Sequence, residues 1–484
     1  LMCLAVGVAI ISAVLGHLGA ITVPLWFGFS GTSTAGAMAV ATGFLFVVAW
    51  IGSPKHGLLT RAFHRIDLRL QILREDVLGI LWRLEERKQE AFQSMQLATV
   101  IGAKFQTSAI NAALANGIMA HADETDDSHY FSNIHAGSMI VPSALAIAER
   151  QGSSGTEFMR AVALGYDVGA RTNLVLTYEA LRSHLYNSHS FGGTFGAAAA
   201  AGVQLGFNAR QMRHLLSYAA QQVGGIRSWV RDPEHVEKAF AVGGMAARNG
   251  TTAALMIEDG FTGVDDVFSG EPNYFDIYVD NPKRRALTDK LGKLYEVTRT
   301  NIKKWSVGSP IQAALDATDA LIREHGFTAD DIETITATLP KFSARTVDNR
   351  AVPNISVQHL IALLVVDGTV TFLSSHDFAR MNDAKVKAVH KKITLKGDLV
   401  LEKARPPRQA IIEIKPKVGK KVRRHVRAVR GTAANPMNRA EVEAKATDLL
   451  TPILGKARTK KLIATIWTLE KVKTVRSLRK LLTA

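Results

Sequence analysis

The sequence predicts a mainly helical protein that also contains a smaller α/β domain and begins with a two-helix transmembrane hairpin. Two long apolar runs without charged residues predict the hairpin. Alanine-rich segments with apolar residues at helical spacing follow, and they predict a helical domain. After residue 272 helical and strand-like patterns alternate, which indicates a domain of mixed structure.

The composition limits the classes of protein that the chain can represent. Its 484 residues are 47% hydrophobic and 21% charged, which is enough for large cores and for more than one domain. The single cysteine, Cys3, excludes a disulfide framework, a Cys-ligated zinc site and a Cys-held iron–sulfur cluster. The formal charge of +16 makes nucleic acid, anionic lipid and acidic small molecules the partners to consider.

Residues 1–54 are predicted to form the hairpin and to insert into the membrane. The runs 1–27 and 33–52 are each close to the ~20 residues that a bilayer-spanning helix needs. Basic residues such as Arg61 and Arg65 follow, so the positive-inside rule places the rest of the chain in the cytoplasm, tethered to the inner membrane. The alternative is a pair of buried core helices.

Residues 55–95 are predicted to form a linker that contains an amphipathic helix. Between residues 65 and 92, apolar residues recur at intervals of three and four, with charged residues between them. On the motifs at 28–36, 53–59 and 73–86, this N-terminal part resembles the C-terminal end of a zinc/manganese-type metal ABC transporter permease. Two spans cannot form a permeation pathway, so we expect no transport by this chain alone.

The stretch 121–129 crowds four carboxylates and two imidazoles into nine residues. An alanine-rich run precedes it, so a helix is predicted to continue into the acidic residues. Like charges at helical spacing repel, and no Lys or Arg occurs between Lys104 and Arg150, so an ordinary surface helix does not explain the pattern. Helical spacing would place His121, Glu124 and Ser128 on one face and Asp123 and Asp127 on another.

Two further positions are candidates for a site. His189 precedes the Gly/Ala-rich segment 192–201, whose small residues predict a closely packed helix, and its side chain could point into a cleft. A lone His is more often a hydrogen-bonded structural residue, however. Lys238 could likewise contribute to a site, but a lysine on a solvated helix face would need no such role.

Many short motifs after residue 97 follow one another in the order and spacing of a known family. They occupy residues 111–117, 120–129, 135–137, 144–149, 194–198, 243–247, 259–263, 303–305, 366–368 and 435–436. On these motifs residues 97–484 resemble the MmgE/PrpD family, which includes 2-methylcitrate dehydratases, cis-aconitate decarboxylases and iminodisuccinate epimerases.

The resemblance implies a discontinuous all-helical domain, formed by residues 96–271 and 431–484. Residues 272–430 would form the smaller α/β domain, and the substrate would lie between the two. A homodimer is also implied. The first helices of the family would be missing, since the permease-like segment stands in their place.

The resemblance also implies a set of site residues. The family positions that face the substrate are Glu124, Ser128, His135, His189, Lys238 and Lys303. Two positions depart from the family pattern, because Glu124 replaces an Asp and Val347 replaces a Tyr. These departures leave the exact substrate and reaction open.

The residue types suit removal of a proton from a carbon next to a carboxylate. Such a reaction needs a base with a pKa near neutrality, which His supplies, and cations that stabilise an enolate-like transition state. The hypothesis makes His135 and His189 the acid/base pair and Lys238 and Lys303 the carboxylate clamps. Glu124, Asp127 and Ser128 are then orienting groups. Of these, Glu124 and Ser128 act in catalysis, whereas Asp127 helps to bind the substrate, as His121 does.

The predicted function is that of a cofactor-independent lyase, of the dehydratase type, which acts on a small di- or tricarboxylate without a metal. An isomerase or epimerase and a decarboxylase of the same family are alternatives. A further alternative is an inactive, truncated enzyme fused to a permease fragment.

The acidic segment 123–127 and the basic segment 385–430 also suggest other functions. Residues 123–127 resemble the Asp-rich magnesium motif of terpenoid synthases, but the second motif that such a site needs is not found. Helix capping and a buried ionic network are a further alternative for Asp123 and Asp126. The basic segment 385–430 lacks interleaved aromatic residues, so we expect a solvated or anion-steering surface and no nucleic-acid partner.

Periodicity also predicts the elements of the later chain. Helices are expected at 152–175, 312–325, 357–366 and 438–484, and strands at 332–339, 386–397 and 409–416.

Overall fold

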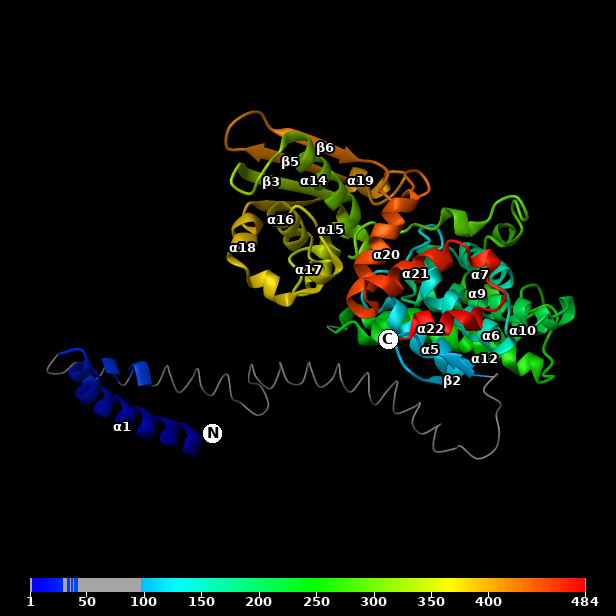
Figure 1. Cartoon of the computed structure of the whole chain (residues 1–484), viewed down its shortest axis with the longest axis horizontal. Helices are drawn as coiled ribbons and strands as arrows, with labels where there is room; N and C mark the ends of the chain where they lie inside the picture. Colours follow the sequence, from blue (N-terminus) through cyan, green and yellow to red (C-terminus); the bar gives the residue numbers. More distant parts are fainter. Residues whose placement is uncertain are drawn as a thin grey trace. The chain divides into compact units, whose positions relative to one another are not determined.

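The computed structural model describes residues 2–28, 33–34, 36–37, 39–41, 97–232 and 234–483. The chain forms two compact units, Leu1–Ala91 and Phe92–Ala484. The second unit contains a helical part and a part with a four-stranded sheet (Figure 1).

The first unit contains helix α1, Met2–Trp26, with Pro24 near its end. Within the described residues, no helix is both long enough and apolar enough to cross a membrane. The predicted transmembrane hairpin is therefore wrong. A run of apolar residues does not by itself establish that a helix spans a bilayer. Most of the second run and the amphipathic helix predicted at 65–92 lie outside the described residues.

The helical part of the second unit opens with a short antiparallel pair, β1 Leu97–Thr99 and β2 Gln106–Ser108. Its longer helices are α5 Ala109–His121, α6 Ala136–Gln151, α7 Gly155–Leu176, α9 Ser188–Gln204, α10 Ala209–Gln222 and α12 Met245–Glu258. Its shorter helices and turns are α8 Tyr178–Ser183, η3 Arg227–Arg231, α11 Val236–Ala239, the π-helical turn η4 Phe240–Gly244, α13 Tyr274–Tyr278, η5 Arg284–Leu287 and η6 Glu296–Arg299.

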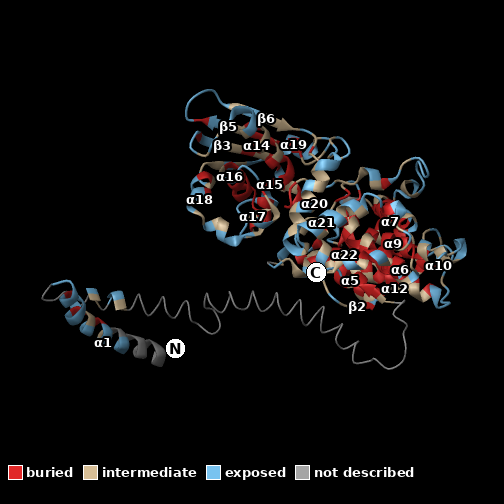
Figure 2. Cartoon of the chain, in the orientation of Figure 1, coloured by how far each residue is buried: buried red, intermediate tan, exposed pale blue. Residues whose placement is uncertain are grey.

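Helix α9 is buried along nearly its whole length and packs against α7 (Figure 2). Glycines make this approach close, because a Cβ at Gly196 would lie 2.6 Å from the carbonyl oxygen of Gly165 and one at Gly192 would lie 2.4 Å from that of Gly169. The close packing that the Gly/Ala-rich segment predicts is confirmed. It also brings His189, in the first turn of α9, into the interior.

Helix α5 ends at His121 and does not continue through the acidic stretch. The predicted helical faces, with Ser128 beside His121 and Glu124, are therefore wrong. The C-terminus of a helix carries partial negative charge, so it disfavours a run of carboxylates. The chain instead turns, and Glu124 adopts a left-handed φ of 56° with its side chain buried.

The sheet of the second part has the strand order β4-β3-β5-β6, with β3 and β4 parallel and the other pairs antiparallel. The strands are β3 Ile332–Pro340, β4 Ile393–Asp398, β5 Ala410–Pro416 and β6 Val422–Val426. The helices and turns are η7 Ser309–Ile311, α14 Gln312–His325, α15 Lys341–Val347, η8 Pro353–Ile355, α16 Val357–Asp367, α17 Phe372–His376, η9 Phe378–Asn382, α18 Ala384–His390 and α19 Leu399–Lys403.

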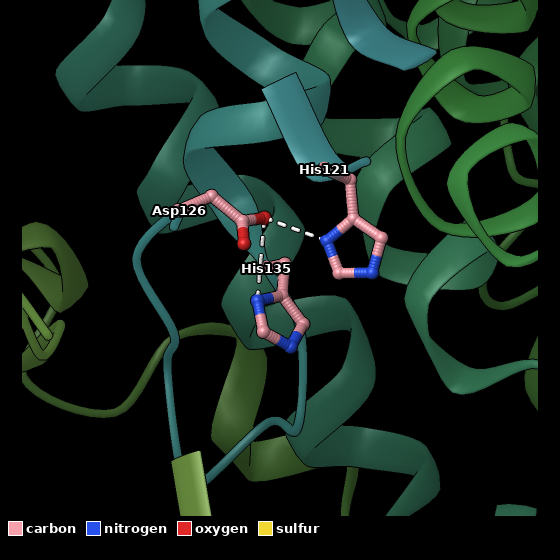
Figure 3. A group of neighbouring side chains, drawn as sticks. All are labelled: His121, Asp126 and His135. Atoms are coloured by element: carbon pink, nitrogen blue, oxygen red, sulfur yellow. Dashed lines mark hydrogen bonds and ion pairs between the residues drawn. The ribbon is translucent and has the colours of Figure 1, made fainter. Parts of the chain in front are cut away.

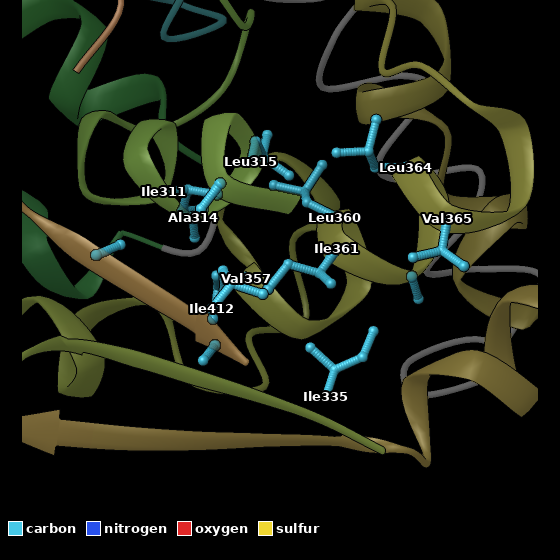
Figure 4. Packing of buried hydrophobic residues seen from close by; sticks show 14 of the residues in the cluster. Ile311, Ala314, Leu315, Ile335, Val357, Leu360, Ile361, Leu364, Val365 and Ile412 are labelled. Atoms are coloured by element: carbon cyan, nitrogen blue, oxygen red, sulfur yellow. The ribbon is translucent and has the colours of Figure 1, made fainter. Parts of the chain in front are cut away.

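The core of this part lies between the sheet and helices α14 and α16 (Figure 4). Ile335 of β3 and Ile412 of β5 share one buried cluster with Leu315 and Leu360 of the helices. The strand predicted at 386–397 is wrong in its first half, which forms α18. Its buried residues Val386 and Val389 are three apart, which is helical spacing.

The C-terminal segment packs on the helical part. Its elements are α20 Arg439–Leu454, α21 Lys456–Ile466, η10 Leu469–Lys471, η11 Val475–Leu478 and α22 Arg479–Leu482. Val475 N donates to Ser153 O at 2.9 Å, and Leu469 shares a buried cluster with Phe158 of α7. A discontinuous helical domain requires contacts of this kind, while the domain boundaries themselves stay a prediction.

We expect Gly196→Ala to destabilise the second unit by about 1–3 kcal/mol, because the added methyl group would overlap the backbone of α7. Gly224→Ala is the matched control, since a Cβ there meets nothing within 4 Å. Denaturant unfolding measures both, and equal midpoints for the two variants would contradict the packing described.

Candidate active site

The loop between α5 and α6, together with His121 and His135 at its two ends, carries five of the eight candidate residues. Segments distant in the sequence hold the loop in place. Ser128 and Asn301 exchange backbone hydrogen bonds of 3.0 and 2.8 Å. The ring of His129 lies 3.0 Å from a carboxylate oxygen of Glu296. These contacts fix the loop between His121, the last residue of α5, and His135, the N-cap of α6.

Asp126 lies at the centre of the site (Figure 3). Its Oδ2 is 2.9 Å from Nδ1 of His121 and 3.3 Å from Nδ1 of His135. Its Oδ1 is 3.6 Å from Nζ of Lys303. His189 continues the row of imidazoles, with its ring centroid 5.2 Å from that of His135.

Two lysines converge on Glu124: Lys303 is buried, and Lys238 is largely but not fully enclosed. Lys238 donates to Oε1 of Glu124, and Nζ of Lys303 lies 3.2 Å from Oε2 and 2.5 Å from the backbone oxygen of the same residue. Lys238 also lies over the ring of Trp229, 5.6 Å from its centroid. One glutamate therefore engages cations that come from positions far apart in the chain.

The segment that carries Lys238 packs directly on α5. Helix α11 leads into the π-helical turn. A Cβ added at Gly243 of this turn would overlap the carbonyl oxygen of Gly117 in α5, so the two backbones are in close contact. Single π-helical turns are frequent at functional sites. His235, just before α11, has a left-handed φ of 61°, as Glu124 does. Strained backbone of this kind also clusters at functional sites.

Burial sets the protonation states of two imidazoles of the site, those of His121 and His189. It lowers the pKa of His121 to about 3 and the pKa of His189 well below its usual value. Burial opposes ionisation of Asp126, but His121, His135 and Lys303 together hold the pKa of this carboxyl well below its usual value. The neutral imidazole of His121 thus lies beside an ionised carboxylate.

Burial and the neighbouring Lys303 lower the pKa of Lys238 to about 7. Burial also lowers the pKa of Lys303, against the opposing effect of Asp126. Perturbed groups gathered in one place are typical of active sites.

Asp127 and Ser128 do not join this cluster. Asp127 accepts hydrogen bonds from Gly137 N at 2.8 Å and from the Tyr166 hydroxyl at 2.6 Å, so it fixes the start of α6. Ser128 is placed through its backbone pairing with Asn301. The six residues that the structure does bring together are His121, Glu124, His135, His189, Lys238 and Lys303, and their roles stay predictions.

Sequence reasoning missed the central position of Asp126. The assumed helix placed it away from His121, and only the alternative of a buried ionic network included it; that alternative is confirmed for Asp126, whereas Asp123 is exposed. Lys445 of α20 was also missed. Its Nζ donates to Thr125 O at 2.7 Å and to Lys303 O at 2.8 Å, and no local pattern signals a contact so distant in sequence.

His121, Asp126 and His135 could hold a divalent metal ion, since their ligand atoms lie within 4.8 Å of one another. Two imidazoles and one carboxylate are a donor set that transition metals use. The Lys303 ammonium, however, already lies against the other oxygen of Asp126. A second positive charge would be repelled there, so the geometry disfavours a metal ion at this site.

The structure therefore has a buried set of imidazoles, lysines and carboxylates, as enzymes that handle acidic small molecules require. Residues 86–286 match the MmgE/PrpD N-terminal domain, and residues 305–471 match the MmgE/PrpD C-terminal domain. The two ranges cover most of the chain, which belongs to the MmgE/PrpD family. These matches give no support to the permease resemblance of residues 1–92.

Two fungal proteins are among its relatives. The cis-aconitate decarboxylase-like protein oryM of Aspergillus oryzae is 27% identical over 242 residues, which are 46% of this chain and 49% of that protein. The cis-aconitate decarboxylase of Aspergillus terreus is 26% identical over 187 residues, 37% of this chain and 36% of that protein. The chain thus aligns with half or less of the length of these relatives.

We expect Tyr166→Phe to destabilise the protein by about 1–3 kcal/mol, because the partly buried Asp127 carboxylate loses a hydrogen-bond donor. Tyr218→Phe is the control, since that hydroxyl donates to Thr262 O in an exposed position. Urea unfolding of both variants tests the structural role of Asp127, and equal losses of stability would contradict it.

Proposed function

We propose that the chain is a lyase that acts on a small di- or tricarboxylate by proton transfer at a carbon next to a carboxylate. The observation that carries the proposal is the placement of Glu124. Its carboxylate is bound by two lysines beside a row of imidazoles. A site that holds one carboxylate between ammonium groups is suited to hold that of a substrate.

His189 is proposed as the base. Burial keeps its imidazole neutral, and its Nδ1 is buried and has no hydrogen-bond partner among the described residues. A neutral ring with a free nitrogen can accept a proton, and the negative charge of a bound carboxylate substrate would raise its pKa toward the neutral range that a base needs. Removal of the proton leaves an enolate-like charge on the substrate, which Lys238 and Lys303 would stabilise.

His135 is proposed as the acid. Asp126 faces its Nδ1, and a carboxylate in this position orients an imidazole and leaves Nε2 to exchange a proton with the substrate. In a dehydration, the C–H electrons form the new double bond, the C–O bond breaks, and His135 protonates the departing hydroxide as water. One base and one acid suffice, so the proposal includes no cofactor.

Decarboxylation is the second candidate reaction. The two relatives named above carry cis-aconitate decarboxylase in their names, and decarboxylation would use the same groups to place a proton on carbon as carbon dioxide leaves. An epimerase would use the same two imidazoles on opposite faces of one carbon. Val347 is buried in α15 and offers no hydroxyl where the family pattern has Tyr, so a phenol at this position takes no part in any of these reactions.

The proposed assembly is a homodimer, as the family resemblance implies, and the proposed substrate is a free small molecule. The alternative of an inactive enzyme is decided by assay.

The full chain is expected to turn over at least one of 2-methylcitrate, cis-aconitate and iminodisuccinate. His189→Gln and His135→Gln should each lower kcat by about 10²- to 10⁴-fold, because each removes one proton-transfer group. His184→Gln is the control, since that histidine is exposed. Full activity in either of the first two variants would overturn the assignment, and a folded chain inactive on all three substrates would favour the inactive alternative.

KM is expected to depend on pH through Lys238. Below about pH 7 this lysine is protonated and attracts a carboxylate, and above it the charge is lost, so KM should rise up to about tenfold per pH unit. Lys238→Arg should remove this alkaline limb, because Arg stays charged. Steady-state kinetics between about pH 6 and pH 9 measure the effect. An unchanged limb in the variant would assign the titration to another group.

A further inference from the structure

We infer that Glu124 is an internal competitor of the substrate: its carboxylate occupies the place between Lys238 and Lys303 that a substrate carboxylate must take. The inference rests on the proposed function and adds to it a residue that sets affinity and selectivity. It assigns Glu124 a role different from that of an orienting group that stays in place beside the substrate.

The contacts of Glu124 differ in kind from those of Asp126. Asp126 is held by two imidazoles on one oxygen and by Lys303 near the other, so removing it from its place would disrupt the whole cluster. The side-chain hydrogen bonds of Glu124 go to the two lysine ammonium groups, which are the groups that a carboxylate ligand would seek. Of the two carboxylates, Glu124 is the one that a ligand can replace.

Charge pairing favours this exchange. In the ion pairs at this place, the two carboxylates of Glu124 and Asp126 already face the two ammonium groups of Lys238 and Lys303. A di- or tricarboxylate would add two or three negative charges to a buried site, where unpaired charges are costly. The ligand can reach both ammonium groups without that cost only when the Glu124 carboxylate leaves them.

The length of the side chain matters as well. Glu124 reaches both lysines from a loop residue with left-handed backbone. An Asp at this position would be shorter by one C–C bond, about 1.5 Å, and would hold the two ammonium groups less well. Glu at 124 therefore favours ligands whose carboxylate can bridge both lysines and disfavours weaker anions.

Binding of propane-1,2,3-tricarboxylate tests the inference, because this probe has three carboxylates and no hydroxyl group to eliminate. Isothermal titration calorimetry with the full chain at about pH 6.5, where Lys238 is protonated, measures the affinity. If Glu124 occupies the lysines in about nine of ten molecules, its removal raises affinity about tenfold. We expect that gain for Glu124→Gln, which keeps the length but not the charge, and a smaller gain for Glu124→Asp.

Asp123→Asn is the matched control. It removes the same charge from an exposed position in the same loop, and we expect no more than a twofold change. Lys303→Met shows whether the probe occupies the proposed site, since loss of that ammonium group should abolish binding. Circular dichroism and thermal melting establish that each variant is folded, and Glu124→Asp keeps the test open if Glu124→Gln is not.

The outcomes separate this inference from the proposed function. Tighter binding in both Glu124 variants, with Asp123→Asn unchanged, supports the inference. Equal or weaker binding in the Glu124 variants, with binding still dependent on Lys303, overturns it and leaves the proposed function standing. Failure of the probe to bind the wild type and both Glu124 variants in a Lys303-dependent way refutes the proposed function itself.

Discussion

Glu124 and Asp126 are buried carboxylates, and lysines from distant segments neutralise them. Lys238 comes from α11, and Lys303 from the segment after η6. Buried charges are tolerated when they are paired, and removal of one partner from such a pair typically costs about 3–5 kcal/mol. This pairing constrains the chain: α5 must end at His121, the loop must turn inward, and segments more than a hundred residues away must supply the cations.

The packing of small residues makes that convergence geometrically possible. Gly243 of the π-helical turn meets Gly117 of α5 at backbone distance, which places Lys238 beside the acidic loop. Gly196 meets Gly165 between α9 and α7, which buries His189. The same burial keeps the His189 imidazole neutral and lowers the pKa of Lys238, so the packing also sets the chemistry. The same packed helices therefore form both the core and the site. Asp127 belongs to the core, because it accepts a hydrogen bond from Gly137 N at the start of α6.

Much of the fold could be predicted from local patterns, because amphipathic spacing and turn residues are local. Helix α14 spans Gln312–His325, as its periodicity predicts, and β3 and α16 lie within a residue of their predicted ends. Predictions from local patterns failed where interactions between charges distant in the sequence determine the structure. The helix expected through 121–128 ends at His121, and Asp126 rather than Ser128 lies at the centre of the site. The contacts of Lys445 have no local signal at all. The prediction of a transmembrane hairpin failed for a different reason, because an apolar sequence alone does not determine whether a helix lies in a bilayer.

The central claim is that this buried cluster moves a proton at a carbon next to a carboxylate. Solvent isotope exchange measures that step most directly and does not require knowledge of the final product. The full chain is incubated in deuterium oxide with 2-methylcitrate, cis-aconitate or iminodisuccinate, and the carbon positions are followed by nuclear magnetic resonance. Deuterium should appear next to a carboxylate of at least one substrate and should be absent with His189→Gln. A folded wild type that binds a tricarboxylate through Lys303 yet exchanges no deuterium with any of the three would contradict the claim.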